Sequence, residues 1–274
     1  MKCRIKDSEV YYETYGEGRP ILSLHGFTLD HRSMIGSLEP ILKRRDGWKR
    51  IYIDLPGHGQ TPGQEWIKNS DDMLEVVLDF IDNVIPDTNF AITGLSYGGY
   101  LARGLVHRRP KRILGLLLIV PRIIGRSEDR TRPEKAVLEQ DDKFLSSLGK
   151  QEREDFVDVA VIQTGKLWPR YAEEITPAVR IADTQFLERL EPGDDDFSFE
   201  VDSLSVKFDG PTLILVGRQD HWVGYQDAWS IIEKYPHATF TVLDRAGHAL
   251  QLEQTELFNV LVSEWLDRVE KAEK

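Results

Sequence analysis

The residues best placed for chemistry form the run GLSYG at positions 94–98, with Ser96 at its centre. An apolar run at 90–93 precedes it, and a stretch that can form a helix follows it. A chain that passes from a strand into a helix within so few residues strains the serine and exposes its hydroxyl. Glycine on either side removes Cβ atoms that would collide where strand and helix pass. The pattern therefore predicts that Ser96 is a nucleophile.

Glycine-rich turns between a strand and a helix also bind phosphates, but neither phosphate-binding spacing is present. No lysine follows the glycines as in G-x-x-x-x-G-K-[ST], and the G-x-G-x-x-G spacing is absent. A bare G-x-S-x-G pattern also arises by chance. The prediction therefore depends on what else the chain supplies.

A serine hydroxyl needs a base that takes its proton and an acid that orients the base. Asp220 follows the apolar run 212–216, and His248 follows the apolar run 239–243. Both are then expected in short loops at the carboxyl ends of strands, in the chain order serine, acid, histidine that such an elbow requires. We predict Ser96, Asp220 and His248 as the catalytic residues.

Other acids and histidines are weaker candidates for these roles. Asp244 lies too early in its loop, and Asp54 lies on an earlier strand. Glu253 lies beyond His248, where it would support a loop or cap the last helix. His221 stands next to the predicted acid and is expected to be a loop or pocket residue.

Negative charge on the attacked carbonyl group needs hydrogen-bond donors. Gly26 follows a predicted strand and allows a sharp turn that directs the backbone N–H of Phe27 into the site. The N–H of Tyr97, at the start of the helix after the nucleophile, supplies the second donor. His25 and His58 are expected to brace loops, and their spacing is not that of metal ligands, so no metal is predicted.

Strand and helix patterns alternate on both sides of the serine, and a charged, mostly helical segment without strand signals interrupts them. This order predicts an α/β fold: a doubly wound, mostly parallel sheet with a helical cap inserted after the sixth core strand. We expect a first core part (1–121), the cap (122–206), which would roof the site, and a second core part (207–274). Strands are predicted at 3–6, 10–14, 21–24, 50–55, 89–94, 113–120, 212–216 and 239–243, and helices at 31–45, 71–84, 224–235 and 253–269, with another ending before Pro110.

Composition excludes several classes of protein. The net charge of −11 argues against binding to nucleic acids or anionic membranes. No apolar stretch is long enough to span a bilayer, and the N-terminus has no signal-peptide pattern. Cys3 is the single cysteine, so no intrachain disulfide can form. We expect a cytoplasmic protein without a cofactor, whose partner is a small-molecule substrate; its oligomeric state is not predicted.

Taken together, the chain resembles the α/β-hydrolase superfamily, in particular its capped, single-domain serine members. The resemblance runs over nearly the whole chain outside 122–206 and implies a Ser-Asp-His triad, an oxyanion hole and a helical cap. Serine at 96 argues against the dehalogenase and epoxide hydrolase branches, which need an aspartate nucleophile. Five stretches carry the resemblance: 16–20 leading to 25–27, 54–61, 94–99, 217–220 and 247–248.

The predicted activity is hydrolysis of a small or medium carboxylic ester through an acyl-enzyme on Ser96. One alternative uses the same triad to hydrolyse carbon–carbon bonds or as a lyase, although Ala249 stands where carbon–carbon hydrolases often carry tryptophan. Another is a non-catalytic ligand-binding protein of this fold. Trp168, Tyr171 and Trp222 are candidate pocket residues, although for the first two the helical spacing favours core packing.

Overall fold

The structure is a computed structural model of the 274-residue chain and describes residues 1–190, 196–203 and 207–272. Part of the predicted cap, including its boundary at 206, lies outside these residues. Within them, no helix combines the length and the apolar character needed to cross a membrane.

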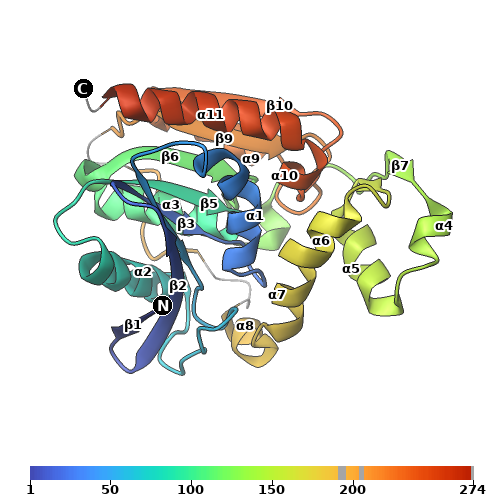
Figure 1. Ribbon diagram of the computed structural model, residues 1–274, viewed down its shortest axis with the longest axis horizontal. Coiled ribbons are helices and arrows are strands. Elements are labelled where there is room, and N and C mark those ends of the chain that lie inside the picture. The colour runs from blue at the N-terminus through green and yellow to red at the C-terminus, as the bar shows by residue number, and fades with distance from the viewer. Residues whose placement is uncertain (191–195, 204–206, 273–274) are drawn as a thin grey trace.

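A mostly parallel sheet of eight strands forms the centre of the described chain, in the order β1-β2-β4-β3-β5-β6-β9-β10 (Figure 1). β2 is antiparallel to both β1 and β4, and each neighbouring pair from β4 to β10 is parallel. The predicted α/β sheet is confirmed. Its strands are β1 Lys2–Ile5, β2 Ser8–Tyr15, β3 Arg19–Leu24, β4 Trp48–Ile53, β5 Phe90–Leu95, β6 Ile113–Ile119, β9 Thr212–Gly217 and β10 Ala238–Leu243.

Helices cover both faces of this sheet, as a doubly wound fold requires (Figure 1). Because side chains alternate along a strand, Leu116 and Leu118 of β6 enter one buried apolar cluster while Leu117 and Ile119 enter the other. The first cluster contains residues of α2, α3 and α9, and the second contains residues of α1 and α11. These helices are α1 His31–Leu42, α2 Ser70–Val84, α3 Tyr97–Arg108, α9 Gln226–Ser230 and α11 Thr255–Ala272, with the short α10 Leu250–Glu253 before the last.

Between β6 and β9 the chain forms a mostly helical segment, whose helices α4 to α7 stand beyond one end of the sheet in Figure 1. Phe144, Phe156, Trp168 and Tyr171 form an aromatic cluster that holds its helices together. Its elements are β7 Glu139–Gln140, α4 Asp142–Leu145, α5 Lys150–Val159, β8 Ile162–Gln163, α6 Trp168–Glu174, α7 Thr176–Ile181 and α8 Thr184–Leu190.

Both ends of this segment attach to α3, the helix that follows the serine. The buried guanidinium of Arg103 donates from Nη1 to the carbonyl oxygens of Arg122 (3.2 Å) and Ile123 (3.1 Å). Its Nε donates to Asp202 Oδ1 at 3.1 Å. One buried cation therefore fixes where the chain leaves the sheet and where it approaches the sheet again.

Several element boundaries differ from the predictions. The prediction of no strand within 122–206 was wrong because β7 and β8 pair there, although two residues each are too short to give a pattern. The helix predicted at 224–235 is the short α9 followed by a 3-10 turn at Ile232–Lys234. The helix predicted at 253–269 is interrupted at Gln254, whose ψ of 46° is not helical.

Candidate active site

Ser96 occupies the turn between β5 and α3 in a left-handed conformation, with φ of 50° and ψ of −110°. A residue other than glycine rarely adopts a positive φ, so hydrogen bonds to neighbouring residues must hold Ser96 in this conformation. The Ser96 N–H donates to Ile119 O at 2.9 Å, and its carbonyl accepts from the N–H groups of Tyr100 and Arg122, each at 3.1 Å. The end of β6 and the first turn of α3 thus fix the predicted elbow.

The flanking glycines have the predicted steric role, with one change. A Cβ on Gly94 would lie 2.3 Å from Gly98 O, as expected for a strand and helix that pass closely. A Cβ on Gly98 would instead lie 2.2 Å from the carbonyl oxygen of Leu24. Gly98 is therefore required by β3, the neighbouring strand, rather than by β5.

Asp220 and His248 meet at the carboxyl ends of β9 and β10. These strands are paired in parallel through Gly217 and Leu243, so the loops that follow them lie side by side. The fully buried Asp220 places Oδ2 2.8 Å from His248 Nδ1. Since an ionised carboxylate only accepts, Nδ1 carries the proton and Nε2 is left with a lone pair.

The indole of Trp222 covers the imidazole of His248, with ring centroids 5.3 Å apart and an interplanar angle of 19°. The N–H of Trp222 also donates to Asp220 Oδ1 at 2.9 Å. One residue of the acid's loop therefore contacts both members of the pair and restricts how the imidazole can turn.

The other three acids considered from the sequence have different partners. Asp244 accepts from Gln219 Nε2 at 2.7 Å, and Asp54 accepts from His31. Glu253 accepts from the N–H of Gly247, the residue directly before His248, at 2.6 Å. The prediction that Glu253 supports this loop is confirmed.

Glu253 also joins the His248 loop to the segment between β6 and β9. Its Oε1 accepts from the N–H groups of Val161 (2.7 Å) and Ile162 (3.2 Å), which belong to that segment. Burial raises the pKa of the Glu253 carboxyl to about 7, against the three backbone hydrogen bonds, which favour the charged form. A single side chain thus links two parts of the molecule that are far apart in sequence.

The turn after β3 holds the peptide between Gly26 and Phe27 in one orientation. His25 Nε2 accepts from the N–H of Leu55 at 2.9 Å, so the proton resides on Nδ1, which donates to Gly26 O at 2.8 Å. Within a trans peptide the carbonyl of Gly26 and the N–H of Phe27 point in opposite directions. The bond from His25 therefore turns the Phe27 N–H away from the imidazole, and the predicted bracing role of His25 is confirmed.

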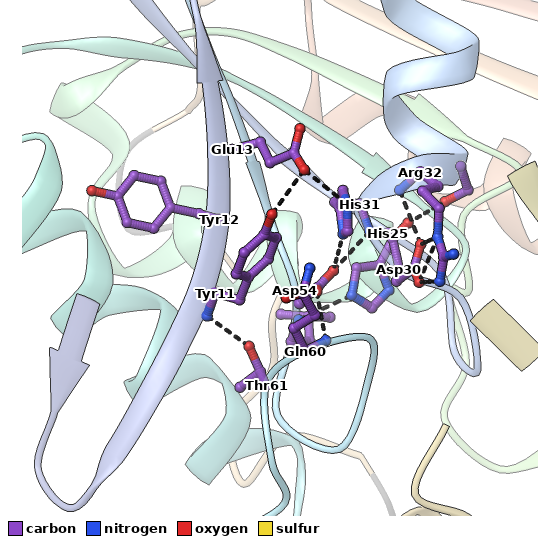
Figure 2. A network of polar contacts seen from close by, with 12 residues as sticks. Tyr11, Tyr12, Glu13, His25, Asp30, His31, Arg32, Asp54, Gln60 and Thr61 are labelled. Atoms are coloured by element: carbon purple, nitrogen blue, oxygen red, sulfur yellow. Dashed lines mark hydrogen bonds and ion pairs between the residues drawn. The ribbon is translucent and has the colours of Figure 1, made fainter. Parts of the chain in front are cut away.

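A buried polar network lies next to His25, the residue that holds this turn (Figure 2). Asp54 Oδ1 accepts from His31 Nδ1 at 2.7 Å, and Asp54 Oδ2 accepts from the N–H of Gln60 at 2.8 Å. His31 Nε2 lies 3.3 Å from Glu13 Oε1. Burial disfavours the imidazolium form of His31, but the hydrogen bond and charge of Asp54, together with the charges of Asp30 and Glu13, outweigh burial and raise the pKa. The network joins β2, the loop after β4 and the start of α1.

Three residues of this network each offer an atom that can ligate a metal ion, and these atoms lie close enough to share one cation: Asp30, His31 and Asp54. Their hydrogen bonds give each of them a structural role. Asp30 caps α1 by accepting from the N–H of Arg32 at 3.0 Å and also pairs with the Arg32 guanidinium. The arrangement therefore fits a brace for the loops better than a metal site.

A cavity of about 670 Å³ opens over Ser96 and His248. Phe27 and Tyr97 line it, with ring centroids 5.6 Å apart. Its other walls combine apolar side chains with charged ones from the segment between β6 and β9. The apolar group comprises Leu29, Val157, Val159, Ile175, Val179 and Val223, and the charged group comprises Arg122, Arg130, Lys135, Glu154, Asp155 and Asp158.

Of the three aromatic residues predicted for the pocket, Tyr171 and Trp222 line the cavity. Trp168 is not among the described residues that line it. Its indole instead contacts Phe144, Phe156 and Tyr171 within the aromatic cluster, with ring centroids 5.6–6.0 Å apart. For Trp168, core packing accounts for the helical spacing.

The model of a protein family described as alpha/beta hydrolase fold matches residues 19–255. The chain belongs to this family. A Legionella pneumophila (strain Corby) protein named pimeloyl-[acyl-carrier protein] methyl ester esterase is 27% identical over 261 residues, covering 94% of this chain and 99% of that protein. An alpha/beta superfamily hydrolase from Oenococcus oeni PSU-1 superposes with a TM-score of 0.87 at 29% identity, covering 95% of this chain and 96% of that one.

A second curated relative of this alpha/beta hydrolase comes from Pseudomonas putida. It is named 2-hydroxy-6-oxononadienedioate/2-hydroxy-6-oxononatrienedioate hydrolase 2, and it is 24% identical over 272 residues, covering 95% of this chain and 92% of that protein. The relatives are hydrolases, and this chain is a hydrolase of the same fold.

Gln251 and Arg122 are among the cavity residues of this alpha/beta hydrolase that were not predicted from the sequence. Gln251 lies on α10 with no pattern around it that distinguishes a pocket residue from a surface one. Arg122 follows β6 directly, and its guanidinium lies over the rings of Tyr97 (5.4 Å) and Tyr100 (5.0 Å). The place of Arg122 at the end of a parallel strand was a usable signal, because ligands bind at that edge.

Proposed function

We propose that the protein is a serine esterase that cleaves a small or medium carboxylic ester through an acyl-enzyme on Ser96. The observation that carries the proposal is the 2.8 Å pair of Asp220 and His248 beside the cavity that Ser96 also lines. A nucleophile in a strained turn, a base with one free ring nitrogen and a buried acid that orients it are what acyl transfer by serine needs.

The proposed reaction begins when Ser96 Oγ attacks the ester carbonyl carbon and His248 Nε2 takes the hydroxyl proton. Asp220 keeps the imidazole in the required tautomer and stabilises its charged form. The N–H groups of Phe27 and Tyr97 donate to the oxyanion of the tetrahedral intermediate. Collapse breaks the bond to the alkoxide, which leaves as an alcohol with the proton from Nε2. Water then attacks the acyl-enzyme with the same base, and the carboxylic acid is released.

The cavity and the relatives support an ester of modest size as the substrate. A volume of about 670 Å³ lies within the range of small-molecule sites. The Legionella relative is named as a methyl ester esterase, which supports ester cleavage. We assign the segment of residues 122–206 as the cap, because Val157, Val159 and Tyr171 from it form part of the cavity wall.

Hydrolysis of a carbon–carbon bond with the same three residues is the second candidate. The name of the Pseudomonas putida relative favours it, since the chains match over nearly their full lengths. Ala249 follows His248 where carbon–carbon hydrolases often carry tryptophan, which favours the ester. The two activities differ in whether the bond broken ends in oxygen or in carbon.

A panel of p-nitrophenyl esters from acetate to decanoate, measured beside a ring-fission substrate, tests the proposal. We expect kcat/KM to be highest for one of the esters. Turnover should fall on the order of 10⁴-fold or more in Ser96→Ala, because triad members act as a unit. Ser230→Ala, on α9 and outside the cavity lining, is the matched control. Faster turnover of the ring-fission substrate would transfer the assignment to carbon–carbon cleavage, and no turnover at all would support a binding protein.

A further inference from the structure

One polar side chain in the cavity wall has no hydrogen-bond partner within the described part of the chain. Gln251 lies on α10, three residues after His248, and lines the cavity. It is 2% exposed, and its amide oxygen accepts no hydrogen bond from the described residues. Its backbone oxygen, by contrast, accepts from Arg170 Nη1 at 3.0 Å and from Thr255 Oγ1 at 3.0 Å. The fold therefore uses the backbone of Gln251 and not its side-chain amide.

A buried amide of this kind is unfavourable unless something binds it. The group carries two donor hydrogens and two acceptor lone pairs, and a buried polar group without a partner destabilises a protein by about 1–3 kcal/mol. Apolar side chains of one cluster line the same cavity, among them Leu29, Ile175 and Ala249. A polar group beside apolar side chains is one way in which small-molecule sites fix the orientation of a ligand.

The charged neighbours of Gln251 are already engaged. The guanidinium of Arg170 donates to Glu174 and to the carbonyl of Gly36. The carboxylate of Glu253, two residues along α10, accepts from Gly247. The neutral amide of Gln251 is thus the group at this position that can still form hydrogen bonds. It suits an uncharged oxygen of a ligand better than a ligand carboxylate.

We propose that the Gln251 amide recognises a hydroxyl group that the substrate carries near its scissile carbonyl group. This inference rests on the proposed esterase function, because it assigns the substrate to the same cavity. A hydroxyl can donate to the amide oxygen or accept from the amide nitrogen, so it pairs with either orientation of the amide. Gln251 is a specificity-determining residue in this account, and Ser96 and His248 perform the reaction.

Two pairs of esters test the inference. One pair adds a hydroxyl to the acyl chain (p-nitrophenyl hexanoate and p-nitrophenyl 3-hydroxyhexanoate), and the other adds it to the alcohol (butyl and 3-hydroxybutyl hexanoate). In the wild type we expect kcat/KM to favour the hydroxylated member of one pair by about tenfold, the value of one neutral hydrogen bond. In Gln251→Met, which keeps the length of the side chain, that ratio should fall to about one. Gln254→Met, outside the cavity lining, should keep the wild-type ratio.

A binding measurement separates this inference from the esterase function itself. Calorimetry compares hexanoate with 3-hydroxyhexanoate, and the two alcohols with each other, and needs no turnover. Tighter binding of a hydroxylated ligand that Gln251→Met abolishes supports the recognition role even if no ester is cleaved. Equal ratios in the wild type and the variant, or no preference in either pair, overturn it and leave ester cleavage untouched. If Gln251→Met does not fold, the wild-type ratios decide alone.

Discussion

Asp220 and His248 are joined through one carboxylate oxygen only. Oδ2 of Asp220 faces His248 Nδ1 at 2.8 Å, while Oδ1 accepts from the N–H groups of Trp222 (2.9 Å) and Val223 (3.1 Å). The two backbone donors fix which oxygen can serve the imidazole. The Asp220 carboxylate is therefore held by its own loop in the orientation that faces His248.

This arrangement predicts the result of replacing Asp220 with asparagine. The amide oxygen of Asp220→Asn should take the place of Oδ1, because both backbone donors require an acceptor there. Its NH₂ group then faces Nδ1 and forces the imidazole into the tautomer protonated on Nε2, which cannot accept a proton from Ser96. We expect kcat for the preferred ester to fall on the order of 10³- to 10⁴-fold with little change in folding.

Asp244→Asn is the control for this experiment, since Asp244 is an exposed carboxylate that accepts from Gln219. It should keep kcat within about twofold of the wild type. A value of kcat for Asp220→Asn within tenfold of the wild type would show that another residue orients His248.

Replacement of Gly98 by alanine should disrupt the elbow by backbone collision. The new Cβ would lie 2.2 Å from Leu24 O and 2.6 Å from His25 O, both main-chain atoms that cannot turn away. We expect Gly98→Ala to lower the free energy of unfolding by about 3 kcal/mol or more, or to prevent soluble expression. Urea denaturation measures the change.

Gly149 provides the matched position, because its φ is −60° and a Cβ there would approach no atom closer than 3.3 Å. Gly149 is the N-cap of α5, so Gly149→Ala should lower the free energy of unfolding by no more than about 1 kcal/mol, the size of a helix-cap effect. Equal stabilities of the two alanine variants would mean that β3 and α3 do not pass as closely as described.

Titration of Glu253 should make stability depend on pH in a defined direction. Burial raises its pKa from 4.5 to about 7, so between these values the folded protein holds a proton that the unfolded chain releases. The resulting stabilisation is complete below about pH 4.5 and is lost as the pH rises through about 7. Glu253→Gln cannot titrate, so the free energy of unfolding of the wild type minus that of the variant should decrease over this range.

Urea denaturation at intervals from pH 4.5 to pH 8 measures this difference. Glu256→Gln, one helical turn along and exposed, is the control and should show no such trend. A difference that stays constant or grows with rising pH would contradict the raised pKa.

The parts that could be predicted from the sequence are those that depend on local pattern. Ser96, Asp220 and His248 each follow an apolar strand, and in a parallel sheet the carboxyl ends of strands share one edge, so chain order was enough to bring them together. The alternation of strands and helices likewise predicted a sheet with helices on both faces.

What could not be predicted depends on contacts between distant parts of the chain. The break between α10 and α11 accompanies the contact of Glu253 with Gly247 and with Val161, a residue 92 positions away. Trp168 and Tyr171 both lie on α6. Of these two, only Tyr171 is placed in the cavity lining by the packing of the inserted segment. No property of either residue alone distinguishes these outcomes.

Covalent labelling tests directly whether Ser96 is the nucleophile. The wild type and Ser96→Ala are treated with a fluorophosphonate, and peptide mass spectrometry locates the adduct while ester hydrolysis is followed in parallel. We expect one adduct in the wild type, on the peptide that contains Ser96, with hydrolysis lost in proportion to labelling, and no adduct in Ser96→Ala. An unlabelled wild type, an adduct on another residue, or full hydrolysis after complete labelling would contradict the assignment of Ser96 as the nucleophile.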